Sequence, residues 1–262
     1  EILASLLISS QIRRKIKKFK KKIKIFSNKP FMETINKLNF DLTNDQKKVL
    51  NEINYDLISK SKMFRLLQGD VGSGKTIVAL ISALNVIESG YQVAFMAPTE
   101  ILAQQHYKLA KKIFPKKIKL DLLTSKIEES KKKIIQQKIF DNDIKIIFGT
   151  HSLFQKRLKF SNLGYLIIDE QHKFGVKQRK LLSDKGGVNC DVLLMSATPI
   201  PRTLIMSIYG DMDLSIIKEK PNYRKDVKTY SKLENKIDEV IKFVKKEISY
   251  GNQIFWVCPL IE

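Results

Sequence analysis

The sequence has 262 residues, with 48 lysines and arginines against 27 acidic residues, so its formal charge is +21. That length allows one large domain, or one domain and part of another. Hydrophobic residues make up 43% of the chain, which excludes a wholly disordered protein. No uncharged apolar stretch reaches the ~20 residues that cross a bilayer, so we expect no segment that spans a membrane.

Residues 11–26 carry nine basic side chains in sixteen positions and no acidic one. Apolar residues recur between them at three- and four-residue steps, which predicts an amphipathic helix with a basic face. A solvated connecting helix and a phosphate-contacting helix both fit this pattern. Such charge favours a polyanionic partner, either nucleic acid or anionic membrane. The abundance of lysine, isoleucine and asparagine also suggests a coding bias, which weakens that argument. We assign residues 1–26 to a basic linker helix.

Short apolar runs alternate with helical patterns from residue 64 onward. The predicted strands cover residues 64–67, 92–97, 119–123, 145–148, 165–168 and 192–195, and the predicted helices cover residues 75–88, 99–113 and 128–140. This alternation predicts βαβ units, and therefore an α/β fold with a mostly parallel sheet and helices on both faces. We assign residues 27–218 to this domain.

The pattern changes after residue 214. Residues 220–223, KPNY, are typical of a turn or linker, and a helix near 234–248 and a strand at 253–258 follow. One helix and one strand cannot close a core, so residues 219–262 are expected to be a linker and the start of another domain. The two cysteines, Cys190 and Cys258, are expected to be buried packing residues, as in a cytoplasmic, reducing setting.

Residues 69–76 read GDVGSGKT and fit the pattern G-x-x-x-x-G-K-[ST]. They follow a predicted strand and open a predicted helix, which is the context of a phosphate-binding P-loop. Backbone N–H groups and the helix N-terminus would bind the phosphates of ATP. Lys75 would reach the β and γ phosphates and the Thr76 hydroxyl would bind Mg²⁺. The loop itself would be formed by Gly69, Gly72, Ser73 and Gly74.

Residues 165–170, YLIIDE, form an apolar strand that ends in two acidic residues, as a Walker B segment does. Asp169 would bind Mg²⁺ through its water shell, and Glu170 would polarise the attacking water as general base. Such a string is weak evidence alone. Glu170, however, lies 95 residues after Lys75, in a chain with the expected alternation of elements.

Residues 169–172, DEQH, form a DExH box, the signature of superfamily 2 helicases. Other segments resemble the motifs of that superfamily in the expected order: residues 40–46 FDLTNDQ, 97–106 APTEILAQQH, 149–153 GTHSL and 196–198 SAT. Four longer segments resemble the bacterial RecG branch-migration helicases in wording: LLQGDVGSGKT, DEQHKFGVKQR, MSATPIPRTL and FWVCPLIE. This resemblance covers almost the whole chain.

The RecG resemblance implies an ATP-dependent DNA helicase that remodels stalled forks and Holliday junctions in DNA repair and recombination. Two RecA-like lobes would move on duplex or branched DNA behind a wedge domain, as a monomer in the bacterial cytoplasm. This chain would hold the linker helix, lobe 1 and the start of lobe 2. The arginine of lobe 2 that contacts the γ-phosphate would lie outside it. We therefore expect the chain alone to bind nucleotide weakly and hydrolyse it slowly.

The resemblance also implies roles for single residues. Gln46 would read the adenine edge, and His172 would link the γ-phosphate to motif III. Coupling roles fall on Ser196, Thr198, Arg179 and Arg202, and DNA contacts fall on Thr99, Gln104, His106, Thr150 and His151. The chain departs from the family at Lys173, where an arginine is common, and at Tyr223, in a turn that usually reads Pro-Gly-Arg.

Three other functions remain open at this stage. A transcription-repair coupling factor shares the FGV and ATPIPRT segments, although it usually has Glu-Gln at positions 171–172. A metabolic P-loop kinase would need a lid for its acceptor substrate and has no reason to carry both DExH and SAT motifs. A non-catalytic basic nucleic-acid binder would not need the P-loop lysine.

Overall fold

The structure is a computed structural model that describes residues 20–27, 29–36, 38, 40–155, 158–170, 187–198, 212–219 and 227–258. The chain divides into two compact units, residues 1–221 and residues 222–262, and each is described by itself. The first unit contains the sheet and its helices. No helix within the described ranges is long and apolar enough to cross a membrane.

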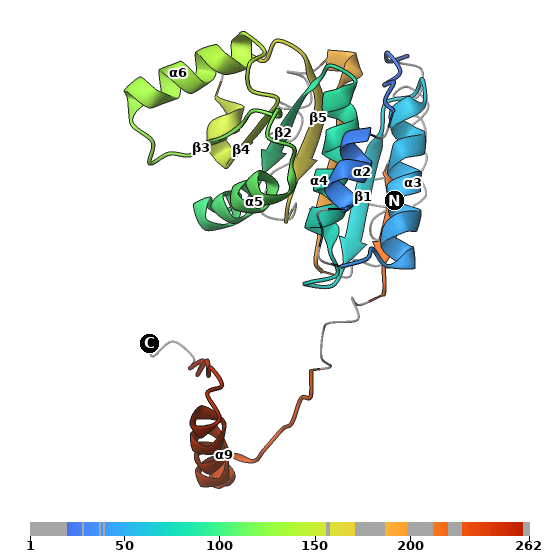
Figure 1. The fold of residues 1–262 in the computed structure, drawn as a ribbon. Coiled ribbons are helices and arrows are strands. Elements are labelled where there is room, and N and C mark those ends of the chain that lie inside the picture. The colour runs from blue at the N-terminus through green and yellow to red at the C-terminus, as the bar shows by residue number, and fades with distance from the viewer. Residues whose placement is uncertain are drawn as a thin grey trace, which may run out of the picture. The chain divides into compact units, whose positions relative to one another are not determined.

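A seven-stranded sheet forms the centre of the first unit (Figure 1). Its strand order is β3-β4-β2-β5-β6-β1-β7, and every neighbouring pair runs parallel. The predicted α/β class with a parallel sheet is therefore confirmed. The strands are β1 (Phe64–Gly69), β2 (Gln92–Met96), β3 (Leu120–Leu123), β4 (Ile146–Gly149), β5 (Leu163–Ile168), β6 (Asp191–Ser196) and β7 (Asp213–Ile217).

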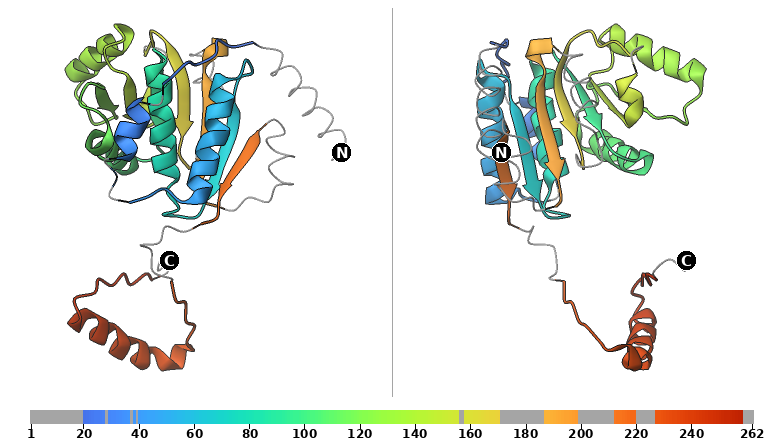
Figure 2. Two further views of the ribbon diagram at one scale, coloured as in Figure 1. Left: turned by 45° about the vertical axis from the view of Figure 1, so that its right-hand side comes forward. Right: turned by 180° about the vertical axis from the view of Figure 1, so that it is seen from behind.

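Helices lie on both faces of the sheet, as predicted (Figure 2). Successive residues of a strand point to opposite faces. In β6, Leu193 and Met195 join a core with α3, α4 and α5, whereas Val192 and Leu194 join a second core with α6 and η1. The helices are α2 (Lys29–Ile35), α3 (Asn44–Ile58), α4 (Lys75–Glu88), α5 (Glu100–Ile113) and α6 (Glu129–Phe140), with the short 3₁₀ turns η1 (His151–Phe154) and η3 (Gly187–Asn189).

The six predicted strands and three predicted helices of this unit are all present, with ends within two residues of the predicted ones. Their apolar runs and helical periods set the local structure, and a side-chain cap fixes the start of α5. Thr99, for example, accepts a hydrogen bond from the Leu102 N–H at the start of α5. The elements α2, α3 and β7 are not among the predicted ones.

Residues 20–27 do not continue the helix predicted over residues 11–26, so that prediction is wrong for residues 20–26. Residues 1–19 lie outside the described residues. Lys20 forms an isolated antiparallel bridge with Ser61, and the backbone N–H groups of Lys21 and Lys24 donate to Lys60 and Leu57 carbonyls. Leu57 lies in the last turn of α3, where carbonyl groups lack partners within the helix. The extended segment supplies the missing hydrogen-bond donor to the Leu57 carbonyl.

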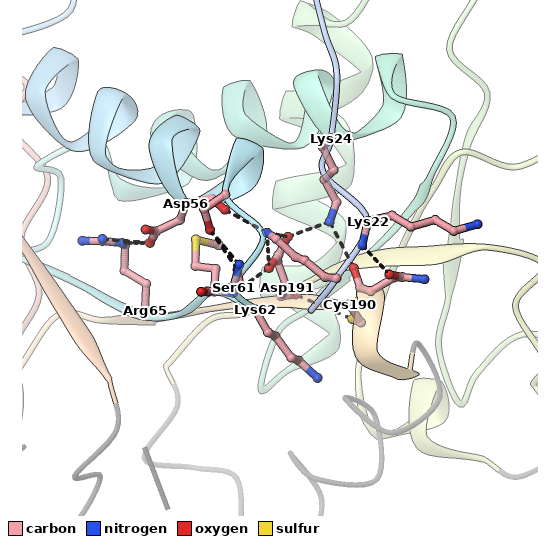
Figure 3. A network of polar contacts seen from close by, with 12 residues as sticks. Lys22, Lys24, Asp56, Ser61, Lys62, Arg65, Cys190 and Asp191 are labelled. Atoms are coloured by element: carbon pink, nitrogen blue, oxygen red, sulfur yellow. Dashed lines mark hydrogen bonds and ion pairs between the residues drawn. The ribbon is translucent and has the colours of Figure 1, made fainter. Parts of the chain in front are cut away.

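The same segment is anchored by a buried ion cluster. Lys24 Nζ lies 2.6 Å and Lys21 Nζ 2.7 Å from Asp191 Oδ2, and all three side chains are fully buried (Figure 3). Asp191 Oδ1 also accepts the Met63 N–H at 2.7 Å. Burial lowers the pKa of Lys21, and the Asp191 carboxylate opposes that effect. One carboxylate at the start of β6 therefore holds two ammonium groups away from water.

The segment after β7 is fixed to the first turn of α3. Asp45 Oδ2 accepts the N–H groups of Lys218 and Glu219 at 2.8 and 2.9 Å, and Glu219 Oε2 accepts the Asp45 N–H at 3.2 Å. These backbone donors lower the pKa of Asp45. The end of the first unit is thereby tied to the turn that also carries Gln46.

The second unit contains the 3₁₀ turn η4 (Glu234–Lys236) and the helix α9 (Ile237–Ser249), which confirms the predicted helix. The prediction of a strand at residues 253–258 is wrong, because these residues pair with no strand in the described part of the chain and a strand needs a partner to bond its backbone. Cys258 is accordingly exposed, contrary to expectation. Cys190 is buried as expected, and burial raises the pKa of its thiol to about 12.

Replacing the shared carboxylate by Asp191→Ala is expected to lower the free energy of unfolding by about 3–5 kcal/mol, because two buried ammonium groups lose their counter-charge. The matched control is Asp143→Ala, which removes an exposed carboxylate paired with Lys119 at 2.5 Å and should change stability little. Denaturant unfolding of the two variants measures the difference. Equal losses would contradict the buried-cluster account.

Candidate nucleotide-binding site

Three sequence motifs meet at one edge of the sheet. The P-loop follows β1, Asp169 and Glu170 follow β5, and the SAT motif spans the end of β6. In the sheet these strands lie in the order β5-β6-β1, and they run parallel. Their carboxyl ends therefore meet at a common edge, which is where open parallel sheets bind ligands.

The turn from β1 into α4 depends on its glycines. Gly72 and Gly74 have φ angles of 77° and 91°, in the left-handed region that side chains disfavour. Gly74 is also the N-cap of α4. A Cβ atom built at Gly74 would lie 2.3 Å from Gln46 Nε2, and one at Gly69 would lie 2.6 Å from Ser73 Oγ. These positions accept glycine alone without a shift of their neighbours.

Lys75 directs its ammonium group into this loop. Its Nζ donates to the carbonyl oxygens of Gly69 at 2.7 Å and Asp70 at 3.0 Å, and only 8% of the residue is exposed. Burial lowers the pKa of Lys75, while the nearby carboxylates of Asp169 and Glu170 oppose the shift. The lysine therefore lies between the loop and the acidic pair. A phosphate bound in the loop would offer it a stronger acceptor than two neutral carbonyls.

The loop fits a bound phosphate. Ser73 Oγ is buried and has no hydrogen-bond partner among the described residues. A buried hydroxyl without a partner is costly, so a ligand oxygen in the loop would stabilise it. Thr76, the second residue of α4, lies at the same helix start and is partly exposed. The donors, the lysine cation and the helix N-terminus together suit the phosphates of a nucleotide. The Thr76 hydroxyl and the Asp169 carboxylate are the oxygen groups that suit its magnesium ion.

Gln46 connects α3 to the loop. Its Nε2 donates to the Ser73 carbonyl at 2.8 Å, and its Oε1 accepts the Thr43 N–H at 3.0 Å. Thr43 and Gln46 form a capping box at the start of α3, so the glutamine is held at both ends. One N–H and one lone pair of its amide remain for a ligand. Its contact with adenine stays a prediction.

Asp169 is held by two donors. Its Oδ2 lies 2.8 Å from Nε2 of His106, and its Oδ1 accepts the Glu170 N–H at 3.0 Å. The Asp169 N–H donates to the Met96 carbonyl of β2 at 2.8 Å. Glu170 has a φ angle of 49°, a strained conformation for a residue with a side chain and one that clusters at functional sites.

His106, whose motif position suggested a contact with DNA, is buried in the structure. Only 7% of the residue is exposed, and its ring faces Asp169 inside the molecule. The reason lies in the helix period: His106 shares the buried face of α5 with Ala103 and Ala110. The motif wording identified the residue, but sequence alone did not show which face it occupies.

Ser196 and Thr198 hold each other in a compact turn. Their hydroxyl oxygens lie 2.9 Å apart, and the Thr198 N–H donates to Ser196 Oγ at 3.2 Å. The Thr198 carbonyl accepts Gln68 Nε2 at 3.0 Å, which joins the turn to the end of β1. Sequence analysis missed Gln68. A polar residue that closes a buried strand just before the P-loop is the signal that points to it.

The remaining predicted residues fall into two groups. Thr99, Gln104 and His151 are exposed, whereas Thr150 is 8% exposed and therefore offers little surface to DNA. His172, Arg179 and Arg202 lie outside the described residues, so the structure does not place them.

The family model described as DEAD/DEAH box helicase matches residues 43–206 of the chain. Among curated proteins, the ATP-dependent DNA helicase RecG of Aquifex aeolicus is 49% identical over 95% of this chain and 32% of its own length. RecG of Bacillus subtilis is 48% identical over 90% of this chain and 35% of its own length. The chain thus spans about a third of these relatives, and the predicted resemblance to RecG is confirmed.

Solved structures agree with this comparison. A RecG bound to a three-way DNA junction matches with a TM-score of 0.87 and 42% identity, over 99% of this chain and 35% of the solved one. The DEAD-box helicase Mss116 matches with a TM-score of 0.62 and 20% identity, over 87% of this chain and 51% of the solved one, which shows a shared fold.

A glycine pair tests the loop geometry. Gly74→Ala should weaken nucleotide binding at least about tenfold, because its Cβ meets the Gln46 amide and its φ is left-handed. Gly90→Ala is the matched control, since its φ is 86° but nothing lies within 4 Å of the new Cβ. Each should lose about 1–2 kcal/mol of stability from the left-handed conformation, and Gly74→Ala should lose more because Gln46 must also shift. Titration with a fluorescent nucleotide measures both affinities. Equal affinity in the two variants would show that the close approach of residue 74 to the Gln46 amide does not matter for nucleotide binding.

Proposed function

The chain belongs to the DEAD/DEAH box helicase family, and we propose that it is the nucleotide-binding part of a RecG-type, ATP-dependent DNA helicase. The whole protein would remodel branched DNA, such as stalled forks and Holliday junctions, in repair and recombination. The observation that carries the proposal is the convergence of Lys75, Asp169 and the SAT motif at one sheet edge. The 49% identity to a RecG over nearly the whole chain supports the choice of helicase type.

In this proposal residues 27–218 form the first motor lobe, residues 1–26 connect it to an upstream part, and residues 219–262 begin the second lobe. The chain divides into two units between residues 221 and 222, which supports the proposed boundary between the first and second lobes near residue 218. The apolar side chains exposed along α9, which include Ile237, Ile241 and Ile248, support an incomplete second core. The extended course of residues 20–27 excludes these residues from a helical linker.

The nucleotide would be held by residues from three segments. Gln46 would contact the adenine, residues 69–76 would bind the phosphates, and Thr76 with Asp169 would hold the Mg²⁺ shell. Magnesium supplies neutralising charge to the phosphate oxygens when it is bound. Glu170 would orient and deprotonate a water as general base. The buried, partnerless Ser73 hydroxyl and the inward Lys75 support this assignment.

Coupling between nucleotide and DNA would run along the same edge. Ser196 and Thr198 are joined through Gln68 to the strand that carries the P-loop, so a change at the phosphates would reach motif III. We assign His172, Arg179 and Arg202 to this coupling from their motif positions. The exposed Thr99, Gln104 and His151 are the proposed DNA contacts.

The partner is proposed to be branched or duplex DNA, and the printed description of one solved relative names a three-way DNA junction. We place the whole protein in the bacterial cytoplasm, where such DNA occurs. We propose that it acts as a monomer. Helicase family membership argues against a metabolic kinase and against a binder without nucleotide chemistry. The 49% identity to a RecG over 95% of the chain favours a RecG over a transcription-repair coupling factor.

Lys75→Ala in the full-length protein should reduce DNA-stimulated ATP hydrolysis by about 10²–10³-fold, because the cation that faces the phosphates is lost. The matched control is Lys116→Ala, an exposed lysine remote from the loop in sequence, which should hydrolyse ATP as the wild type does. Phosphate release with and without a three-way junction measures both. A wild-type protein that hydrolyses ATP at the same rate with and without DNA would sink the proposal.

A second measurement concerns the chain alone. Residues 1–262 should hydrolyse ATP about 10³-fold or more slowly than the full-length protein, because the proposed phosphate-contacting arginine of the second lobe is worth 10³–10⁵ in rate. The comparison is made with saturating nucleotide and the same DNA. Turnover by the short chain near the full-length rate would contradict the two-lobe site.

A further inference from the structure

His106 and Asp169 come from different elements and meet inside the protein. The histidine lies on α5, which follows β2, and the aspartate ends β5, the strand that pairs with β2. The two residues are 63 positions apart, yet Nε2 of the histidine lies 2.8 Å from Oδ2 of the aspartate. Their side chains are only 9% and 11% exposed. Parallel pairing of β2 and β5 therefore creates this contact.

The direction of the hydrogen bond follows from the chemistry of the two groups. An ionised carboxylate only accepts hydrogen bonds, so Nε2 carries the proton that it donates. The other carboxylate oxygen accepts the Glu170 N–H at 3.0 Å. Each oxygen thus has one fixed donor, and rotation of the carboxylate would break both bonds. Each oxygen also keeps a lone pair for another partner, such as a metal-bound water.

The ring of His106 is held in place from the side. It packs against the ring of Phe95 with centroids 4.8 Å apart, and Phe95 in turn stacks on Phe148 at 5.3 Å. These strand residues belong to the core that α5 covers. The aromatic contacts fix the ring plane, so the histidine presents its nitrogen to Asp169 in a single direction.

We infer that His106 is a positioning residue that orients the Asp169 carboxylate for the magnesium ion of the nucleotide site. This inference rests on the proposed function, since it concerns the metal bound at that site. Donors behind a metal-binding carboxylate or imidazole fix its orientation, and their removal typically costs 10–100-fold in metal affinity. His106 would act through Asp169, without binding the nucleotide or the metal itself.

The test measures metal binding directly in the full-length protein. Mn²⁺ replaces Mg²⁺ as the probe, and the signal of free Mn²⁺ in electron paramagnetic resonance reports binding in the presence of ADP. His106→Phe should weaken Mn²⁺ binding about 10–100-fold, because the ring keeps its volume but loses the donor. His106→Gln should restore most of the affinity, since an amide N–H can reach the carboxylate.

Gln105→Ala is the matched control, because Gln105 is the neighbouring residue of α5 and its side chain is exposed. It should bind Mn²⁺ as the wild type does. Thermal unfolding shows whether each variant is folded. Should His106→Phe not fold, His106→Asn takes its place, since its shorter side chain cannot reach Asp169 and the same loss is expected.

Wild-type Mn²⁺ affinity in a folded His106→Phe or His106→Asn variant would overturn the inference. An equal loss in His106→Phe and His106→Gln would also overturn it, because packing and not the donor would then be responsible. DNA-stimulated ATP hydrolysis by the wild type separates the two proposals. If that activity is present while the variants bind Mn²⁺ normally, only the role of His106 fails; if the wild type binds no Mn²⁺ with ADP, both proposals fail.

Discussion

The parallel pairing of β5, β6 and β1 is the constraint on which the rest of this molecule depends. Parallel strands end at the same edge, so motifs that are far apart in sequence arrive side by side. The P-loop, the acidic pair and the SAT turn therefore lie at the same sheet edge without a bound ligand. Hydrogen bonds then connect them: Gln46 reaches the loop, Gln68 reaches the SAT turn and His106 reaches Asp169.

Sequence patterns predicted the parts of this site whose chemistry is local. Left-handed glycines before a lysine, and an apolar strand that ends in acids, specify their own backbone, so the P-loop and Asp169 are where they were expected. Helix faces were harder to predict. A motif shared by relatives gives no orientation, so the burial of His106 against the Asp169 carboxylate could not be predicted. Gln68 was missed because its partner, the Thr198 carbonyl, lies 130 residues away.

The fold outside the site was likewise predicted from sequence only in part. Six strands and three helices follow directly from apolar runs and periods. The course of residues 20–27 does not, because Lys21 and Lys24 resemble one solvated basic face in sequence but are buried against Asp191. Because Asp191 lies 167 positions from Lys24, the sequence pattern did not show that these lysines are buried. The charge of +21 therefore does not by itself define a DNA-binding surface, because Lys21 and Lys24 contribute to it and are buried.

The central claim is that the P-loop and the acidic pair form a single magnesium–nucleotide site. Hydrogen exchange of the full-length protein, with and without Mg²⁺ and a non-hydrolysable ATP analogue, tests it most directly. Amide exchange is expected to slow in residues 69–76 and in residues 165–170 together, and both effects should require the metal. Slower exchange in the loop alone, or the same protection without Mg²⁺, would contradict it.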